Sequence, residues 1–156
     1  MDTGLKTWAE IVRQVYPDLS ILQDRTQWLA GEYERPSVYI ETDLISDKAY
    51  SPRTDRIIED VGLVFHFDKV REAEEDEGEP VPFDLNPFFT FLRQRRFCYA
   101  SKMFGVALVI EPPRTRKDKD KVEVVFRCSY LLHVPKPAGE KINTFYTEYD
   151  GREYEA

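Results

Sequence analysis

The chain has 156 residues, a length that fits one domain of ordinary size, and 42% of them are hydrophobic. Its formal net charge of −7 disfavours sequence-independent binding to the phosphates of DNA or RNA. No apolar run approaches the roughly 18 residues of a membrane span, and the first residues lack the pattern of a secretory signal. We therefore expect a domain that folds in a cytosol and whose partners are other proteins.

The first half of the chain predicts a helix followed by a β-hairpin. Apolar residues recur at helical spacing over residues 5–15, and Pro17 ends that helix. One strand begins after Pro36. A second strand, over residues 57–67, alternates apolar and polar residues as a strand with one buried face does. The two strands are expected to pair antiparallel.

An acidic segment separates this hairpin from a second helix. Residues 71–82 combine six acidic side chains with glycine and proline and cannot bury much apolar area, so they predict a mobile loop. Asn86 and Pro87 then suit the start of a helix that continues to residue 96. The sequence thus predicts a second helix directly after the acidic loop.

The pattern of the last part of the chain predicts β structure. Residues 106–110 are nearly all apolar, as in a central strand, and residues 122–132 alternate as one long amphipathic strand. Between them, residues 112–121 predict a basic hairpin loop, and residues 141–156 predict a short strand or extended arm. The expected fold is an α+β domain over residues 1–140, with one mixed or mainly antiparallel sheet of about four or five strands and two helices packed on one face.

No convincing catalytic or metal site is visible. The closest pair among His66, His133, Cys98 and Cys128 is five residues apart, whereas zinc ligands usually come in closer pairs on turns. Neither cysteine sits at a turn or helix start, where a reactive thiolate is favoured. No glycine-rich loop could cradle a phosphate, and neighbouring carboxylates are unavoidable with 29 acidic residues. We therefore predict no enzymatic activity and no cofactor.

The two charged loops and the C-terminal arm are the candidate contact sites. The loops can simply be solvated connections, or they can meet another subunit or passing DNA. The arm holds aromatic residues where a monomer has little left to bury, so they can contact another chain or pack on their own sheet. The candidate residues are Glu72, Glu74, Glu75, Asp76, Glu77, Glu79, Arg114, Arg116, Lys117 and Lys119 in the loops, and Phe145, Tyr146 and Tyr149 in the arm.

The order of the predicted elements follows a known pattern. Its features are a first helix ending Val15-Tyr16-Pro17-Asp18, the segment Ile21-Leu22-Gln23-Asp24, a strand opening Arg35-Pro36-Ser37-Val38-Tyr39-Ile40, the long strand over residues 57–67, the helix over residues 87–96, and a last hairpin. This order resembles that of the tail terminator (tail-completion or head-tail joining) proteins of tailed bacteriophages and prophage-derived tail particles. The resemblance spans most of the chain.

The resemblance implies a structural protein that forms a ring, typically of six subunits, on the finished tail tube. Its implied partners are copies of itself, the tail tube protein, the head connector protein, and DNA that passes without sticking. It would occur in the host cytoplasm during assembly and then in the virion or tail-like particle. A closed ring needs two different complementary patches on each subunit. The acidic and basic loops are a hypothetical pair of this kind, unless the acidic residues line the lumen.

Two alternatives stay open at this point. The first is a head-tail connector or stopper protein of the same particle, which would have a similar size and composition. The second is a monomeric bacterial protein-binding module, for instance an immunity or regulatory protein. The state of association separates them, because a ring supports particle assembly and a strict monomer supports the module.

Overall fold

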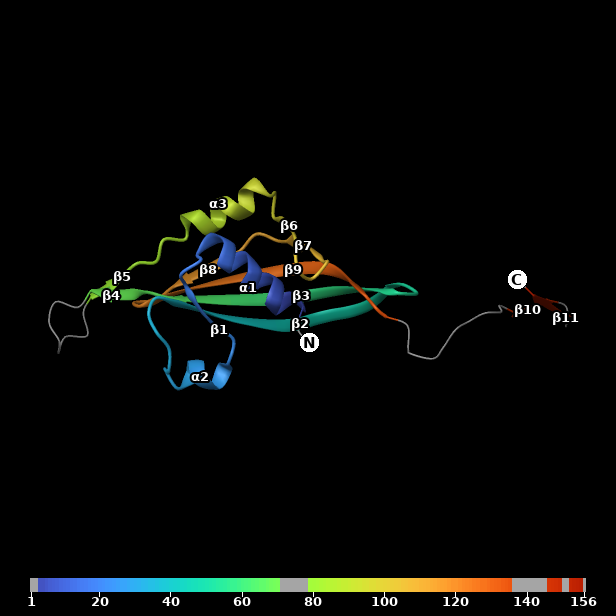
Figure 1. Ribbon diagram of the computed structural model, residues 1–156, viewed down its shortest axis with the longest axis horizontal. Coiled ribbons are helices and arrows are strands. Elements are labelled where there is room, and N and C mark those ends of the chain that lie inside the picture. The colour runs from blue at the N-terminus through green and yellow to red at the C-terminus, as the bar shows by residue number, and fades with distance from the viewer. Residues whose placement is uncertain (1–2, 71–78, 136–145, 150–151, 156) are drawn as a thin grey trace.

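The computed structural model describes residues 3–70, 79–135, 146–149 and 152–155 (Figure 1). Most of these residues belong to strands, which build a curled mixed sheet accompanied by three short helices. The helices are α1 (Thr3–Val15), α2 (Arg25–Leu29) and α3 (Asn86–Gln94). The strands are β1 (Ser20–Leu22), β2 (Ser37–Ser51), β3 (Thr54–His66), β4 (Asp68–Val70), β5 (Glu79–Val81), β6 (Cys98–Ala100), β7 (Ala107–Ile110), β8 (Arg114–Lys117), β9 (Lys121–His133), β10 (Tyr146–Tyr149) and β11 (Arg152–Glu155).

Three long antiparallel strands, β2, β3 and β9, form the centre of the sheet. The strand order is β1-β2-β3-β9-β7-β6, and β8 also pairs with β9. β1 joins β2 in parallel, while every other pair in this sheet is antiparallel. Pro112 and Pro113 lie between β7 and β8, which both pair with β9. Proline lacks the N–H that a ladder requires, so the partner of β9 on this side is split into two short strands.

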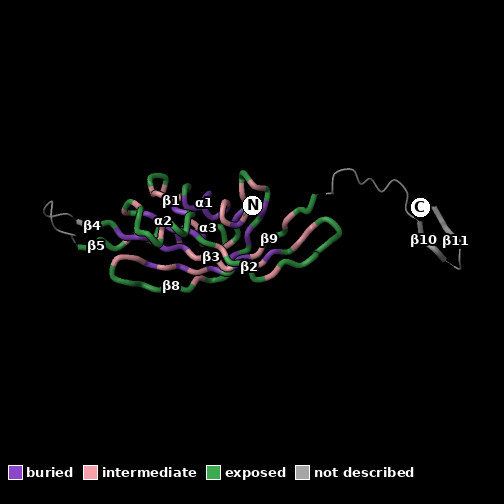
Figure 2. Tube along the Cα trace, turned by 90° about the horizontal axis from the view of Figure 1, so that it is seen from below, coloured by how far each residue is buried: buried purple, intermediate pink, exposed green. Residues whose placement is uncertain are grey.

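The main core lies between the sheet and the helices α1 and α3, which cover the same face (Figure 1). The alternation of β3 turns Val61, Leu63 and Phe65 toward these helices, and all three are fully buried. Trp8 of α1 stacks on Phe126 of β9, with 4.9 Å between ring centroids. Figure 2 shows the buried positions gathered in the middle of the long strands, while β8 and the tip of the β2–β3 hairpin are exposed.

A buried carboxylate fixes α1 to the segment after β6. Glu10 Oε1 accepts hydrogen bonds from the Tyr99 hydroxyl at 2.9 Å and from the Lys102 backbone N–H at 2.8 Å. Its Oε2 accepts from the Ser101 hydroxyl at 2.7 Å. Burial alone would raise the pKa of Glu10, but these hydrogen bonds outweigh it and hold the pKa below its usual value. Burial and the nearby Glu10 also raise the pKa of Tyr99 to about 12.

The expected α+β fold with a sheet of four or five strands and two helices is wrong, because most of the described residues lie in strands, the curled sheet is larger and the three helices are short. The sheet is larger because β1, β6 and β8 are only three or four residues long and leave no detectable alternation in the sequence. A third helix, α2, forms before the strand that follows Pro36, where the sequence pattern predicts no helix, and it lies on the other face of the sheet (Figure 1). Residues 114–117 of the expected basic loop form β8, so the turn itself is shorter.

Candidate functional site

The second face of the sheet, opposite α1 and α3, is covered at one end by α2. Trp28 of α2 stacks on Tyr39 of β2, with 4.3 Å between ring centroids, and both lie near Val64 of β3. The helix begins where it does because Asp24 Oδ1 caps it, accepting from the Thr26 N–H at 2.9 Å. Within the described residues, no other helix lies on this face, which we call the open face.

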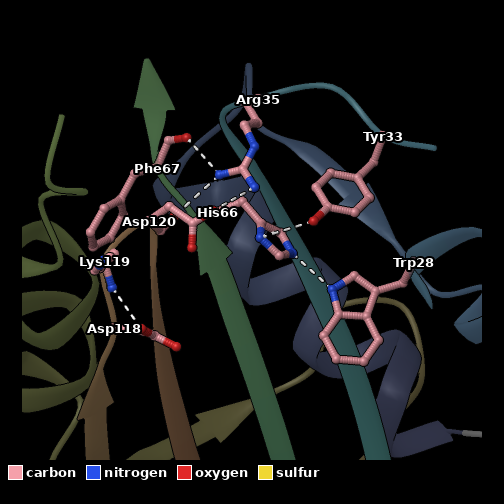
Figure 3. A network of polar contacts seen from close by, with 8 residues as sticks. All are labelled: Trp28, Tyr33, Arg35, His66, Phe67, Asp118, Lys119 and Asp120. Atoms are coloured by element: carbon pink, nitrogen blue, oxygen red, sulfur yellow. Dashed lines mark hydrogen bonds and ion pairs between the residues drawn. The ribbon is translucent and has the colours of Figure 1, made fainter. Parts of the chain in front are cut away.

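A histidine at the end of β3 anchors α2 to the open face (Figure 3). Trp28 Nε1 donates a hydrogen bond to His66 Nε2 at 2.8 Å, and Tyr33 Oη lies 3.4 Å from His66 Nδ1. An indole N–H can only donate, so Nε2 accepts and the proton of the neutral ring sits on Nδ1. Burial, with help from the charges of Arg35 and Lys121, lowers the pKa of His66 to about 4. The ring is therefore neutral at physiological pH.

An ion pair closes the same cluster. Arg35 Nη2 lies 3.0 Å from Asp120 Oδ2, and Arg35 Nη1 donates to the backbone carbonyls of Phe67 and Asp120 (Figure 3). These contacts join the segment before β2 to the end of β3 and to the β8–β9 turn. Both ring nitrogens of His66 face neighbouring side chains of the chain itself. The arrangement therefore holds α2 in place and fixes the β8–β9 turn to the end of β3.

We expect His66 to make the stability of the protein depend on pH. Its pKa is about 4 in the folded chain against 6.5 in an unfolded one, so lower pH favours the unfolded chain, which binds the proton more readily. The contribution of the neutral His66 ring to the free energy of unfolding is complete above pH 6.5 and is lost as the pH falls toward 4. It amounts to at most about 3 kcal/mol, because one pKa unit corresponds to about 1.4 kcal/mol. Urea unfolding at several pH values measures it.

The matched controls for this prediction use both histidines. His66→Phe is expected to flatten the dependence of unfolding free energy on pH between 4 and 6.5. His133→Gln is expected to leave that dependence intact, because His133 is exposed at the end of β9. An unchanged slope in the His66 variant would show that another group causes it.

Charged side chains occupy the middle of the open face. Arg127 of β9 binds Asp60 of β3 through two hydrogen bonds of 2.8 and 3.1 Å. Hydrogen bonding to Arg127 lowers the pKa of Asp60, and the same contact raises the pKa of Arg127. Two shallow hollows share this region, and the charged residues lining them are Arg25, Glu41, Asp43, Asp60, Arg116, Asp118, Lys121 and Glu123. Acidic and basic side chains are mixed in this region, so it is not suited to bind either a small cation or a small anion.

An apolar hollow lies at the far end of the open face. The residues that line it are Tyr50, Arg56, Gly105, Ala107, Val109, Ser129, Tyr130 and Leu131. Tyr50, Val109 and Leu131 are 66%, 55% and 45% exposed, which is high for large apolar side chains. Tyr50 falls at an irregularity in the β2–β3 register, between Ala49 and Ser51. Such a bulge changes the direction of a side chain, and this one contributes Tyr50 to the hollow.

Two long stretches of strand edge also lack a partner strand within the described residues. β2 pairs with β1 at only three positions, so its outer edge from Asp43 to Ser51 is open. β8 pairs with β9 on one side and presents its other side at the opposite edge of the sheet. The open part of β2 includes Asp43, Asp47 and Lys48, whereas the charged residues of β8, Arg114, Arg116 and Lys117, are all basic. One edge is thus partly acidic and the other basic.

The predicted contact residues fall in different places. Arg114, Arg116 and Lys117 lie on β8 and Lys119 in the following turn, all exposed. Glu79 is exposed on β5. Tyr146 and Tyr149 lie on β10, which pairs with β11. Glu72, Glu74, Glu75, Asp76, Glu77 and Phe145 lie outside the described residues.

The cysteines and histidines considered for metal binding lie in separate environments. Cys128 is buried in the main core, Cys98 is exposed on β6, His66 contacts α2, and His133 is exposed. Within residues 3–70 and 79–135, no group of three or more histidine, cysteine or acidic side chains could hold a metal ion. The structure therefore does not assemble these four residues into one site.

Comparison with known proteins does not assign the chain to a family. It matches no protein-family model and no curated protein. Among the described helices, none is both long and apolar enough to cross a membrane. What the protein does must therefore be argued from its own surface.

The sequence did not indicate the cluster around His66 or the apolar hollow. A signal for the cluster existed, because the aromatic residues Trp28 and Tyr33 interrupt a mainly polar segment just before a strand. Val64 was a second signal, as an apolar residue on the polar side of the β3 alternation. The sequence contains no signal for the apolar hollow. Its lining comes from four strands and a loop, which come together only through the pairing register of the sheet.

Proposed function

We propose that this protein is a structural assembly subunit, a phage tail terminator that forms a ring, caps the tail tube and joins it to the head connector. The observation that carries the proposal is the open face of the sheet, which ends in an apolar hollow and is bordered by two open strand edges. Large exposed apolar patches on otherwise polar surfaces typically mark contacts with other proteins. The order of elements that resembles the tail terminator family supplies the specific role.

The apolar residues exposed near the β2 edge support association. Leu44, Ile45 and Tyr50 are 59%, 45% and 66% exposed, and all lie on the open part of β2. Open edges readily accept another strand, and natural monomers usually protect them. A chain that leaves apolar side chains on such an edge has a surface suited to a neighbouring protein.

The unequal charges of the two edges support a head-to-tail arrangement. The open edge of β2 carries Asp43, Asp47 and Lys48, while the charged residues of the β8 edge, Arg114, Arg116 and Lys117, are all basic. Two different patches that complement each other produce a heterologous contact, which closes into a ring when the rotation between subunits allows it. Contacts between identical patches would instead stop at a dimer. Charge complementarity of this kind favours the correct register and speeds encounter.

Negative-stain electron microscopy of the purified chain tests the proposal. Closed rings with a central hole are expected, and rings added to tail tubes are expected at one end of each tube. Rings that bind a head connector and ignore tail tubes would indicate a stopper protein instead. Single small particles at every concentration would contradict the proposal and favour a monomeric binding module.

A further inference from the structure

The apolar hollow combines apolar and positively charged residues in its lining. Arg56 lies directly opposite Lys48 on one side and Leu131 on the other, and Val109 lies opposite Ser129 in the neighbouring row. Small residues, Gly105 and Ala107, also line the hollow, so it stays open between the larger ones. Apolar walls beside positive charge fit a ligand that carries both aromatic rings and carboxylates.

Two cations near the hollow form no ion pair within the described residues. Lys48 and Arg56 are exposed cross-strand neighbours, and neither takes part in an ion pair there. Like charges placed directly opposite each other on a sheet repel. An acidic partner would remove this repulsion, so the position favours a negatively charged occupant.

The C-terminal hairpin of the chain has the matching composition. Residues 146–155 contain three tyrosines and four acidic residues against one arginine. Its strands β10 and β11 pair with each other and with no strand of the main sheet. A hairpin of two strands is marginally stable in water unless it packs on something. Tyrosine is also among the residues that most often anchor protein contacts.

The proposed head-to-tail ring indicates a second copy of the chain as the receptor, because each subunit must then offer its hairpin to one neighbour and its hollow to the other. Hollow and hairpin are also two different patches, as a head-to-tail contact requires. We propose that the C-terminal hairpin of one subunit docks in the apolar hollow of the next. This inference rests on the proposed ring and assigns one of its contacts.

Reversing the charges of the hollow and of the hairpin tests this docking by light scattering. Lys48→Glu with Arg56→Glu makes the hollow acidic, and Glu148→Lys with Glu153→Lys makes the hairpin basic. Each double variant alone is expected to drop from the ring mass to the monomer mass of 18.4 kDa. Mixing the two is expected to restore the ring, because each altered hairpin then meets an altered hollow and each natural hairpin a natural one.

The matched control changes the same amount of charge elsewhere. Arg13→Glu with Lys69→Glu alters residues on α1 and β4, away from the hollow, and is expected to keep the ring. If the natural chain forms rings and the hollow variant forms them equally well, the docking is wrong while the proposed function survives. Variants that stay monomeric when mixed would also overturn docking between copies. A natural chain that is always monomeric would overturn the proposed function itself.

Discussion

Replacing Trp8 with alanine is expected to lower the free energy of unfolding by about 3–5 kcal/mol, which is the usual cost of removing a fully buried tryptophan. Trp8 is 0% exposed and contacts the rings of Phe88 and Phe126, so it joins α1, α3 and the sheet. Truncation leaves a cavity at the centre of the core. Urea unfolding followed by circular dichroism measures the change.

Trp8→Phe is the matched control for this core variant. The Trp8 Nε1 atom is buried without a hydrogen-bond partner, and an unsatisfied buried donor itself costs about 1–3 kcal/mol. Phenylalanine removes that donor and keeps most of the ring, so we expect a loss below about 2 kcal/mol. Equal losses for the two variants would mean that ring packing at this position contributes little.

Replacing Glu10 with alanine is expected to cost about 3 kcal/mol. The carboxylate accepts three hydrogen bonds, from Tyr99, Ser101 and the Lys102 backbone, and bonds to a charged group are each worth about 1.5–3 kcal/mol but do not add fully. The variant would leave these donors without their acceptor. It would also free the segment after β6, which includes Gly105 of the apolar hollow.

The dependence of the unfolding free energy on pH separates the stabilisation due to the charge of Glu10 from that due to its shape. Because the folded chain holds the pKa of Glu10 below 4.5, the stabilisation is present above pH 4.5 and is lost as the pH falls through the folded pKa. Glu10→Gln keeps the shape and one acceptor oxygen but cannot titrate. We expect this variant to be less stable than the natural chain at pH 7, with the difference shrinking in acid. A difference that is constant with pH would contradict the account.

The sequence indicates the long elements of the fold because their patterns are long. The alternation over residues 57–67 and over residues 122–132 corresponds to β3 and β9, and the first helical stripe corresponds to α1. The strands that define the edges are too short for any periodicity. α2 has five residues and is held by Trp28 on His66, a contact 38 residues apart in the chain. Such contacts cannot be read from local pattern.

The candidate surface could be foreseen only in part. The basic residues from Arg114 to Lys119 are a visible charge run, and the structure adds that three of them lie on an open strand edge. The apolar hollow depends on the register of four strands, and Tyr50 joins it through a bulge that shifts the pairing after Ala49. A shift of one residue reverses which face a side chain occupies. Sequence alone therefore could not place Tyr50 in the same hollow as Val109.

The central claim is that the open face and edges serve the assembly of identical subunits into a closed ring. The mass of the natural chain in solution, measured by light scattering over a wide range of concentrations, tests this most directly. The account expects one dominant species whose mass is a fixed multiple of 18.4 kDa, close to six, and does not grow further with concentration. A mass of 18.4 kDa at every concentration, or one that rises without limit, would contradict it.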